Sequence, residues 1–176
     1  MDDIAQQLGK SKKTIYLHFK NKNDVIEKLT QLELRSELKE LENLSNMHLN
    51  AIDQMMAISK YLETKIFNLN HALLHDMKKY HSSIWETFVK QRELQIESLV
   101  NRNLQMGINQ GLYLENIKTE NFIISYLLRL HFIDYEFYMT YKSESYNENY
   151  DTLFLYHVYS ISNDTGIRYL QEKYRQ

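Results

Sequence analysis

The 176-residue chain contains no cysteine and no proline, and it has only four glycines. Without cysteine it forms neither disulfides nor thiolate metal sites, and a cysteine nucleophile is excluded. Because proline is absent and glycine is scarce, almost nothing in the chain breaks a helix strongly. These absences favour an all-α fold, and the lack of cysteine permits a reducing compartment.

Long hydrophobic runs are missing as well. No segment approaches the roughly 20 consecutive apolar residues that span a bilayer, and the opening Met-Asp-Asp lacks the basic and apolar character of a secretory signal. The sequence also lacks a Gly-rich phosphate loop, a Gly-x-Ser-x-Gly motif and a cysteine–histidine arrangement. We therefore predict a cytoplasmic protein that contacts no membrane, is not an enzyme and needs no cofactor.

The charge that is present is unevenly distributed. The formal net charge is −2, with 43% hydrophobic and 25% charged residues, as in an ordinary globular protein. The first 28 residues nevertheless carry six lysines against four acidic residues, which leaves the remainder of the chain net acidic. A basic module at one end predicts a polyanion as the partner of that end only.

Two short helices joined by a tight turn are predicted at this basic end. Gly9 suits the left-handed conformation that ends a helix, and Ser11 stands where the N-cap of the next helix belongs. Each helix has an apolar stripe, made by Ile4, Ala5 and Leu8 in the first and by Ile15 and Phe19 in the second. This is the helix-turn-helix arrangement, whose second helix enters the major groove of DNA.

The segment "DIAQQLGKSKKTIYLHFKNKNDVIEKL" resembles the DNA-binding segment of the TetR family of bacterial transcriptional regulators. The family's pattern is an Ile-Ala pair, a Leu-Gly pair, a serine, a Thr-aliphatic-Tyr-x-x-Phe core and a lysine that opens the next helix. The residues that match it are Ile4, Ala5, Leu8, Gly9, Ser11, Thr14, Ile15, Tyr16, Phe19 and Lys22. The resemblance covers about the first 28 residues.

The resemblance implies which side chains meet DNA. Lys12 and Lys13 would enter or border the groove, and Lys22 would hold a phosphate from the start of the next helix. The other implied contacts to phosphates or bases are made by Ser11, Thr14, Tyr16 and His18. Lysines neutralise phosphates, hydroxyls fix the register, and few side chains reach base edges. The alternative is a solvated, lysine-rich helix with a buried tyrosine.

The start of the sequence departs from the family's pattern. Members place a further helix before this pair and pack it across both helices, whereas the sequence opens at Met1, next to the first helix of the pair. Uncovered apolar groups the size of Ile4, Ile15 and Phe19 cost about 1.5–3 kcal/mol each. We therefore expect an incomplete DNA-binding module at 1–28 and weak DNA binding by this chain alone.

Residues 29–176 are predicted to form a helical bundle for ligand binding and dimerisation. Apolar residues at three-four spacing predict a long helix over 21–45, a helix that includes 52–69 and two helices over 71–106 with a break near 80–83. Gly107 and Gly111 mark the next turn. Two last helices are predicted at about 120–142 and 151–174.

In the family, the last two helices pair with their two-fold copies in a homodimer. The residues that this resemblance places in the dimer interface are Phe122, Tyr126, Leu130, Leu153, His157, Ile161, Ile167 and Leu170. Two symmetry-related recognition helices would read half-sites about 34 Å apart. The alternative is that both helices only cover the core of their own chain.

The family also senses small molecules within the bundle. Aromatic or polar residues at otherwise apolar positions are candidates to line a pocket, although each would serve equally well as ordinary core: His75, Trp85, Phe88, Met106, Tyr126 and His131. His71 and His75, one turn apart, could share a metal, but no third ligand has a defined spacing, so no metal site is predicted.

The sequence and the resemblance together predict a ligand-responsive transcriptional repressor. Its partners would be a double-stranded DNA operator, an unidentified small-molecule effector and a second copy of the chain. The alternative is a helical dimer that binds a small molecule or a protein without binding DNA.

Overall fold

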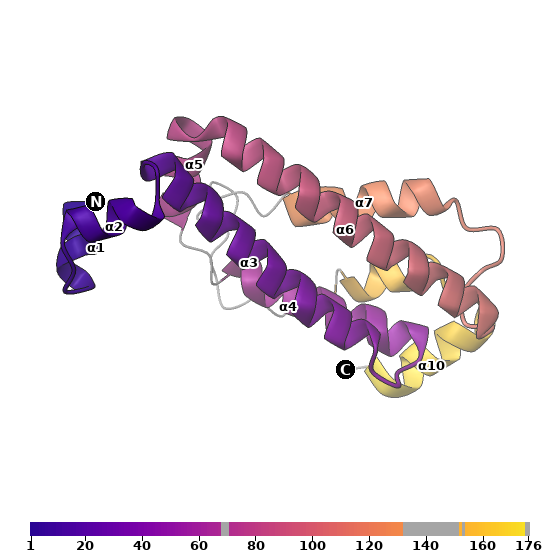
Figure 1. The fold of residues 1–176 in the computed structure, drawn as a ribbon. Coiled ribbons are helices and arrows are strands. Elements are labelled where there is room, and N and C mark those ends of the chain that lie inside the picture. The colour runs from indigo at the N-terminus through magenta and orange to yellow at the C-terminus, as the bar shows by residue number, and fades with distance from the viewer. Residues whose placement is uncertain (68–70, 132–151, 153, 175–176) are drawn as a thin grey trace.

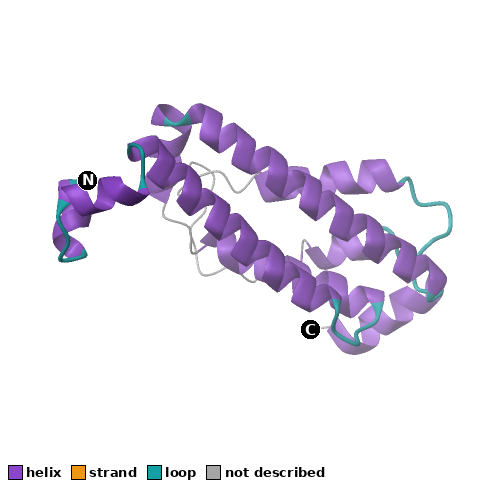
Figure 2. Ribbon diagram, in the orientation of Figure 1, coloured by secondary structure: helices purple, strands orange, loops and turns teal. Residues whose placement is uncertain are grey.

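The computed structural model describes residues 1–67, 71–131, 152 and 154–174. Their regular elements are helices joined by short turns and loops, as Figure 2 shows, and the predicted all-α fold is confirmed. The labelled helices are α1 (Asp2–Gln7), α2 (Lys12–His18), α3 (Lys22–Ser45), α4 (Ala51–Phe67), α5 (His71–Tyr80), α6 (Ser82–Asn109), α7 (Thr119–His131) and α10 (Asp164–Tyr174). A further helical stretch covers 154–159.

The long helices form an elongated body with a small head at one end. In Figure 1, α3 and α6 run along the length of the body, while α1 and α2 project beyond the N-terminal end of α3. Helix α10 and the C-terminus lie at the opposite end of the body. The head therefore meets the body through the first turns of α3.

The hydrophobic core lies between α3, α4, α6 and α7, with the C-terminal helices closing it. Its most deeply buried side chains include Leu41 of α3, Met55 and Leu62 of α4, Leu104 of α6 and Leu170 of α10. These residues recur at helical spacing along one face of each helix, so burial of that face accounts for the packing.

A buried amide fixes the start of α4 against α6. The Nδ2 of Asn103 donates to the carbonyl of Ala51 at 2.8 Å and to Oε1 of Gln54 at 2.9 Å, and its Oδ1 accepts from the hydroxyl of Tyr113 at 3.1 Å. Burial raises the pKa of Tyr113 far above its ordinary value, so the phenol remains a donor. Every polar group of this network has a partner, as a buried network requires.

Two ion pairs hold α3 against its neighbours. Arg92 of α6 donates from Nε to both carboxylate oxygens of Glu37 at 2.9 Å and from Nη2 to Oε1 at 2.7 Å. Glu37 is only 4% exposed. Nearer the head, Lys65 of α4 reaches Glu33 at 2.8 Å. The Arg92 fork neutralises a charge that would otherwise be buried alone.

The sequence places several helix ends correctly. The long helix predicted for 21–45 is α3, capped by Asn21, and the predicted break near 80–83 falls at His81. Helix α6 ends at Asn109, between the two glycines, and Gly111 adopts φ +66°. The start of α3 and the turn after α6 carry local signals, the cap Asn21 and the glycine Gly111, whereas His81 makes no side-chain cap.

The predicted single helix over 151–174 is wrong, because the chain turns at 160–163 before α10 begins. Asn163 caps α10, its Oδ1 accepting from the amides of Thr165 and Gly166 at 3.0 Å each. The backbone amide of Asn163 also donates to the carbonyl of Leu112 at 3.1 Å. Gly166 lies against that same carbonyl, so it serves packing within the chain. Of the other predicted helix, over about 120–142, residues 132–142 lie outside the described residues.

Replacing Arg92 by Met is expected to lower the free energy of unfolding by about 3 kcal/mol, because the Glu37 carboxylate is left buried without its counter-ion. Urea denaturation measures this loss. Arg102→Met, at an exposed position of the same helix, is the matched control and should change stability little. If the two variants are equally stable, Glu37 and Arg92 do not fix α3.

Candidate nucleic-acid interface

The turn between α1 and α2 depends on one glycine. Gly9 has φ +59°, in the left-handed region that other residues rarely adopt. Its amide donates to the carbonyl of Gln6, and the amide of Lys10 donates to the carbonyl of Ala5, which closes the end of α1. The chain can therefore reverse direction within Leu8–Lys10 and start a second helix, as the sequence predicts.

Helix α2 begins at the predicted cap. Oγ of Ser11 accepts from the amide of Thr14 at 3.0 Å, and the two hydroxyls lie 2.8 Å apart in a hydrogen bond. Ile15 of this helix is buried, and Phe19, the extended residue that follows its C-terminal end, is half-buried. Ser11 and Thr14 thus use their hydroxyls to start the helix, and Thr14 is half-buried.

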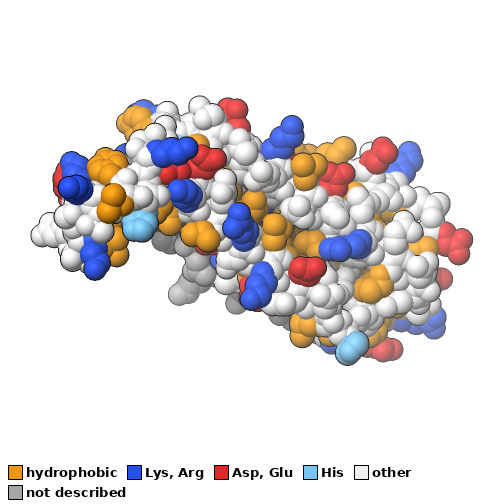
Figure 3. Space-filling model, in the orientation of Figure 1, with side chains coloured by type: hydrophobic (Ala, Val, Ile, Leu, Met, Phe, Trp, Pro, Cys, Tyr) orange, Lys and Arg blue, Asp and Glu red, His pale blue; other side chains and the backbone are white. Residues whose placement is uncertain are grey.

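The outer side of the head carries the predicted basic residues. Lys13, Tyr16 and His18 of α2 are exposed, as is Lys22 at the start of α3. Figure 3 shows lysine side chains beside hydrophobic ones over the protruding head. Three of these exposed side chains lie on α2 and the fourth on the first residue of α3, so basic and hydroxyl groups are close together in the head, as contacts with a polyanion require.

Lys12 differs from this group because it pairs with Asp2 of α1 at 2.9 Å. The hydrogen bond and attraction from Lys12 hold the pKa of Asp2 below its usual value, and the same bond raises the pKa of Lys12. Both side chains are well exposed, so water screens the pair and a phosphate could displace Asp2. The sequence prediction did not include this partner.

The turn from α2 to α3 is held by side chains of α3 and its cap. Oδ1 of Asn21 accepts from the amide of Asp24 at 3.0 Å, and Oδ2 of Asp24 accepts from the amide of Lys20 at 2.7 Å. The Lys20 amide is the main reason that the pKa of Asp24 lies below its usual value, and Lys28 contributes. These hydrogen bonds fix the path of the backbone from α2 into α3.

Lys28 connects the end of α2 to α3. Its Nζ donates to the carbonyl of His18 at 3.1 Å and to Oδ2 of Asp24 at 3.2 Å, and it lies 5.0 Å from the centre of the Phe19 ring. A cation at the C-terminal end of a helix is favourable, because the last carbonyls there lack partners within the helix. Sequence reasoning missed Lys28 because it lies ten residues from His18.

The structure places several predicted dimer residues inside their own chain. Phe122 and Tyr126 of α7 are buried, as are Ile161 and Leu170, and His157 stacks on Phe122 with ring centres 4.3 Å apart. Ile167 is half-buried, the side chain of Leu130 is not described, and Leu153 lies outside the described residues. The four buried residues are part of the chain's own core. Among the α7 side chains that the structure describes, Ile124 and Leu128 are exposed and apolar.

The structure does not bring the predicted pocket residues together. Trp85 and Phe88 pair at the N-terminal end of α6, with ring centres 5.9 Å apart, while Met106 is about 30 Å further along that helix. His75 is exposed beside Asp76. Tyr126 is buried, with its hydroxyl 2.8 Å from that of Ser59. The side chain of His131, at the end of α7, is not described.

A cavity of about 930 Å³ lies instead between α4, residues 152 and 154–159, and the end of α10. Polar groups in its wall include Asp53, Ser59 and Glu63, and Met56 is among the apolar ones. Glu63 is buried, and Lys60 reaches it at 3.2 Å. The signal for this site was available, because Asp53 and Glu63 interrupt an otherwise apolar face of the helix predicted to include 52–69.

Asp53 joins α4 to α10 at one edge of this cavity. Its carboxylate accepts from the hydroxyls of Tyr169 and Tyr174, at 2.6 and 2.7 Å, and from Lys173 at 2.6 Å. Burial alone would raise the pKa of Asp53, but these donors outweigh it and hold the pKa below its usual value. The resulting stabilisation is present above about pH 4 and is lost as the pH falls through the lowered pKa.

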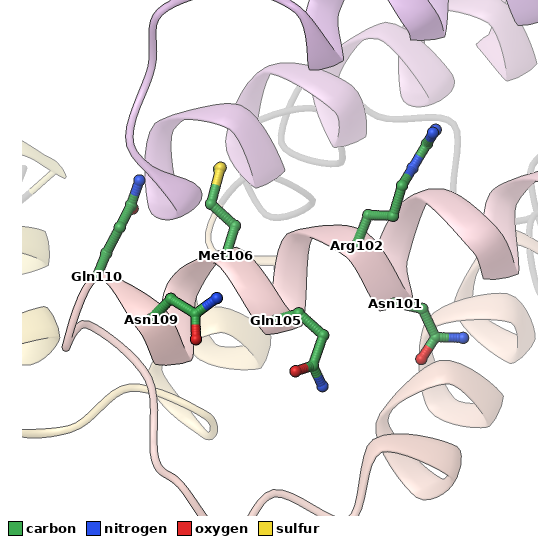
Figure 4. Close-up of a pocket in the computed structure, with 6 residues that line it drawn as sticks. All are labelled: Asn101, Arg102, Gln105, Met106, Asn109 and Gln110. Carbon is green, nitrogen blue, oxygen red and sulfur yellow. The ribbon is translucent and has the colours of Figure 1, made fainter.

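A second hollow crosses the surface of α6, as Figure 4 shows. Asn101, Gln105 and Asn109 point to one side of the helix, and Arg102, Met106 and Gln110 point to the other. Oε1 of Gln110 accepts from the amide of Ala51 at 2.8 Å and so serves the start of α4. The two rows do not converge on a common point, which argues against a binding site there.

The described residues contain no group of three metal-ligating side chains placed to share an ion. The side chain of His71 lies outside the described residues, so the pair of His71 and His75 is not tested. Within the same part of the chain, no helix has both the length and the apolar character needed to cross a membrane.

Replacing Lys28 by Met is expected to speed amide hydrogen exchange across α2 about tenfold, because the end of α2 loses its donor and the Phe19 ring loses its cation. Exchange measured by mass spectrometry on residues 12–18 tests this. Lys39→Met, at an exposed position of α3, is the control. Equal exchange in both variants would show that Lys28 does not hold the head.

Comparison with known proteins agrees with the architecture of the head. Residues 1–29 match the family model of the bacterial regulatory proteins of the tetR family. Over 132 residues the chain is 28% identical to an uncharacterized HTH-type transcriptional regulator, YvaF, of Bacillus subtilis (strain 168). That alignment covers 72% of this chain and 66% of the relative, so the chain spans slightly less than two thirds of the relative's length. No solved structure gives a significant match. The match to the tetR family is thus confined to the helix-turn-helix segment at residues 1–29.

Proposed function

We propose that the chain is a DNA-binding transcriptional regulator in which α2 is the recognition helix. The observation that carries this proposal is the projecting head, where Lys13, Tyr16 and His18 are exposed on the capped α2 within the family-matched segment. Lysines there would neutralise phosphates, and the outer face of α2 would enter the major groove. The family match and the relative's description support a regulator without enzymatic activity, as the sequence predicts.

The regulator would act as a homodimer and respond to a small molecule. The contact between copies would use the exposed Ile124 and Leu128, which lie one turn apart on α7. The effector would occupy the cavity beside α4, whose wall combines apolar groups with Asp53 and Glu63. Repression, with release of DNA on effector binding, is the behaviour that the family resemblance implies.

Contacts between helices provide a route for this response. Helix α4 lines the cavity and packs against α3, which carries the head, and Lys65 and Glu33 join the two helices by an ion pair. A ligand that favours one position of α4 would bias the position of α3 and thus the separation of two heads. Ligand and DNA would then weaken each other's binding by the same coupling free energy.

DNA binding is tested by titrating residues 1–176 with double-stranded DNA at several salt concentrations and following fluorescence anisotropy. We expect binding with a steep salt dependence and two chains per duplex. Lys13→Ala should reduce the slope of log K against log salt by about 0.9 for each phosphate that is no longer neutralised.

Lys90→Ala, at an exposed position of α6, is the matched control and should leave the slope unchanged. Binding that does not depend on salt, or an equal effect of both variants, would contradict the proposal. The absence of duplex binding at every salt concentration would favour the alternative of a helical binding protein that does not contact DNA.

A further inference from the structure

Leu17 is the most exposed large hydrophobic side chain of the described residues, with 75% of its surface accessible. It lies in α2, between Tyr16 and His18. A single exposed leucine is common on protein surfaces. This one differs because it lies on the helix that carries the candidate DNA contacts.

The geometry of α2 fixes the direction of Leu17. Ile15 is the buried residue of α2 and so marks the inner face of the helix. Successive residues of an α-helix are about 100° apart, so Leu17 lies about 160° from Ile15, on the opposite side. Lys13, one turn earlier, lies on the same outer side. Leu17 is therefore at the centre of the surface that α2 presents to a partner.

The neighbouring charges favour DNA as that partner. Lys13 shares the outer side of α2 with Leu17, while Lys12 and Lys20 are exposed close by in the same segment. A surface that binds another protein is more often a larger apolar patch, without so many lysines around a single apolar residue. A polyanion matches the surroundings of Leu17, provided that it also offers an apolar group.

The major groove offers one such group, the C5-methyl of thymine. Leucine can neither donate nor accept a hydrogen bond through its side chain, so it cannot read the other base edges directly. We propose that Leu17 is a specificity-determining residue that packs on a thymine methyl in each half-site. This inference rests on the proposed function of α2 as a recognition helix and adds the chemical group that one of its residues reads.

The test removes the thymine methyl group and the Leu17 side chain in separate experiments. An operator is first obtained by selecting randomised duplexes on the full chain, and each thymine of the selected site is then replaced by deoxyuridine. This change removes the methyl group and keeps the hydrogen-bonding pattern. We expect one position per half-site at which the wild-type chain loses affinity about fourfold, the effect of one buried carbon group.

Leu17→Ala should lose affinity for the thymine site and become insensitive to deoxyuridine at that same position. The substitution is compatible with folding, because the side chain is exposed and alanine favours helices. Leu94→Ala is the matched control, since Leu94 is 55% exposed on α6, and it should keep the full sensitivity of the wild type.

Two other outcomes are distinguishable. If specific, salt-dependent binding is found but no thymine shows a loss that depends on Leu17, the assignment of Leu17 is overturned and the proposed function stands. If no duplex binds in a salt-dependent manner, the proposed function fails, and the inference about Leu17 fails with it.

Discussion

The ion pair between Glu37 and Arg92 is the contact on which the arrangement of the molecule depends. It fixes α3 against α6, because the Arg92 guanidinium donates through two nitrogens to the buried Glu37 carboxylate. Helix α3 both packs against the core and supports the head. Because α3 continues without interruption from Lys22 to Ser45, a shift where it is clamped would be transmitted to the head. An uninterrupted helix transmits such movements with little loss, since every peptide group is held by its neighbours.

Different interactions stabilise the head and the body. The body buries continuous apolar faces and a satisfied polar network around Asn103. The head has little core of its own, with Ala5 and Ile15 as its buried residues, and is organised by caps, one left-handed glycine and the contacts of Lys28. Local hydrogen bonds thus orient α2, while its outer face stays free to meet a partner.

The sequence predicts those features that depend on neighbouring residues. Gly9 marks the C-terminal end of α1, and Ser11 and Asn21 mark the starts of α2 and α3, as the sequence predicts. The interruption before α10 was missed because it depends on a backbone contact between Asn163 and Leu112, about fifty residues apart in the chain. In the candidate sites, too, features set by residues distant in the chain could not be predicted. An apolar stripe such as that of Phe122 and Tyr126 looks alike whether its own chain or a second copy covers it, and the structure shows that its own chain does.

The outer face of α2 is the surface that we propose meets DNA. Nuclear magnetic resonance of the labelled chain, titrated with duplex DNA, tests this most directly, because each backbone amide reports separately. We expect the amides of residues 11–22 to shift or broaden first, while those lining the cavity beside Asp53 change little. Changes confined to the helical body, with the amides of α2 unaffected, would contradict this assignment.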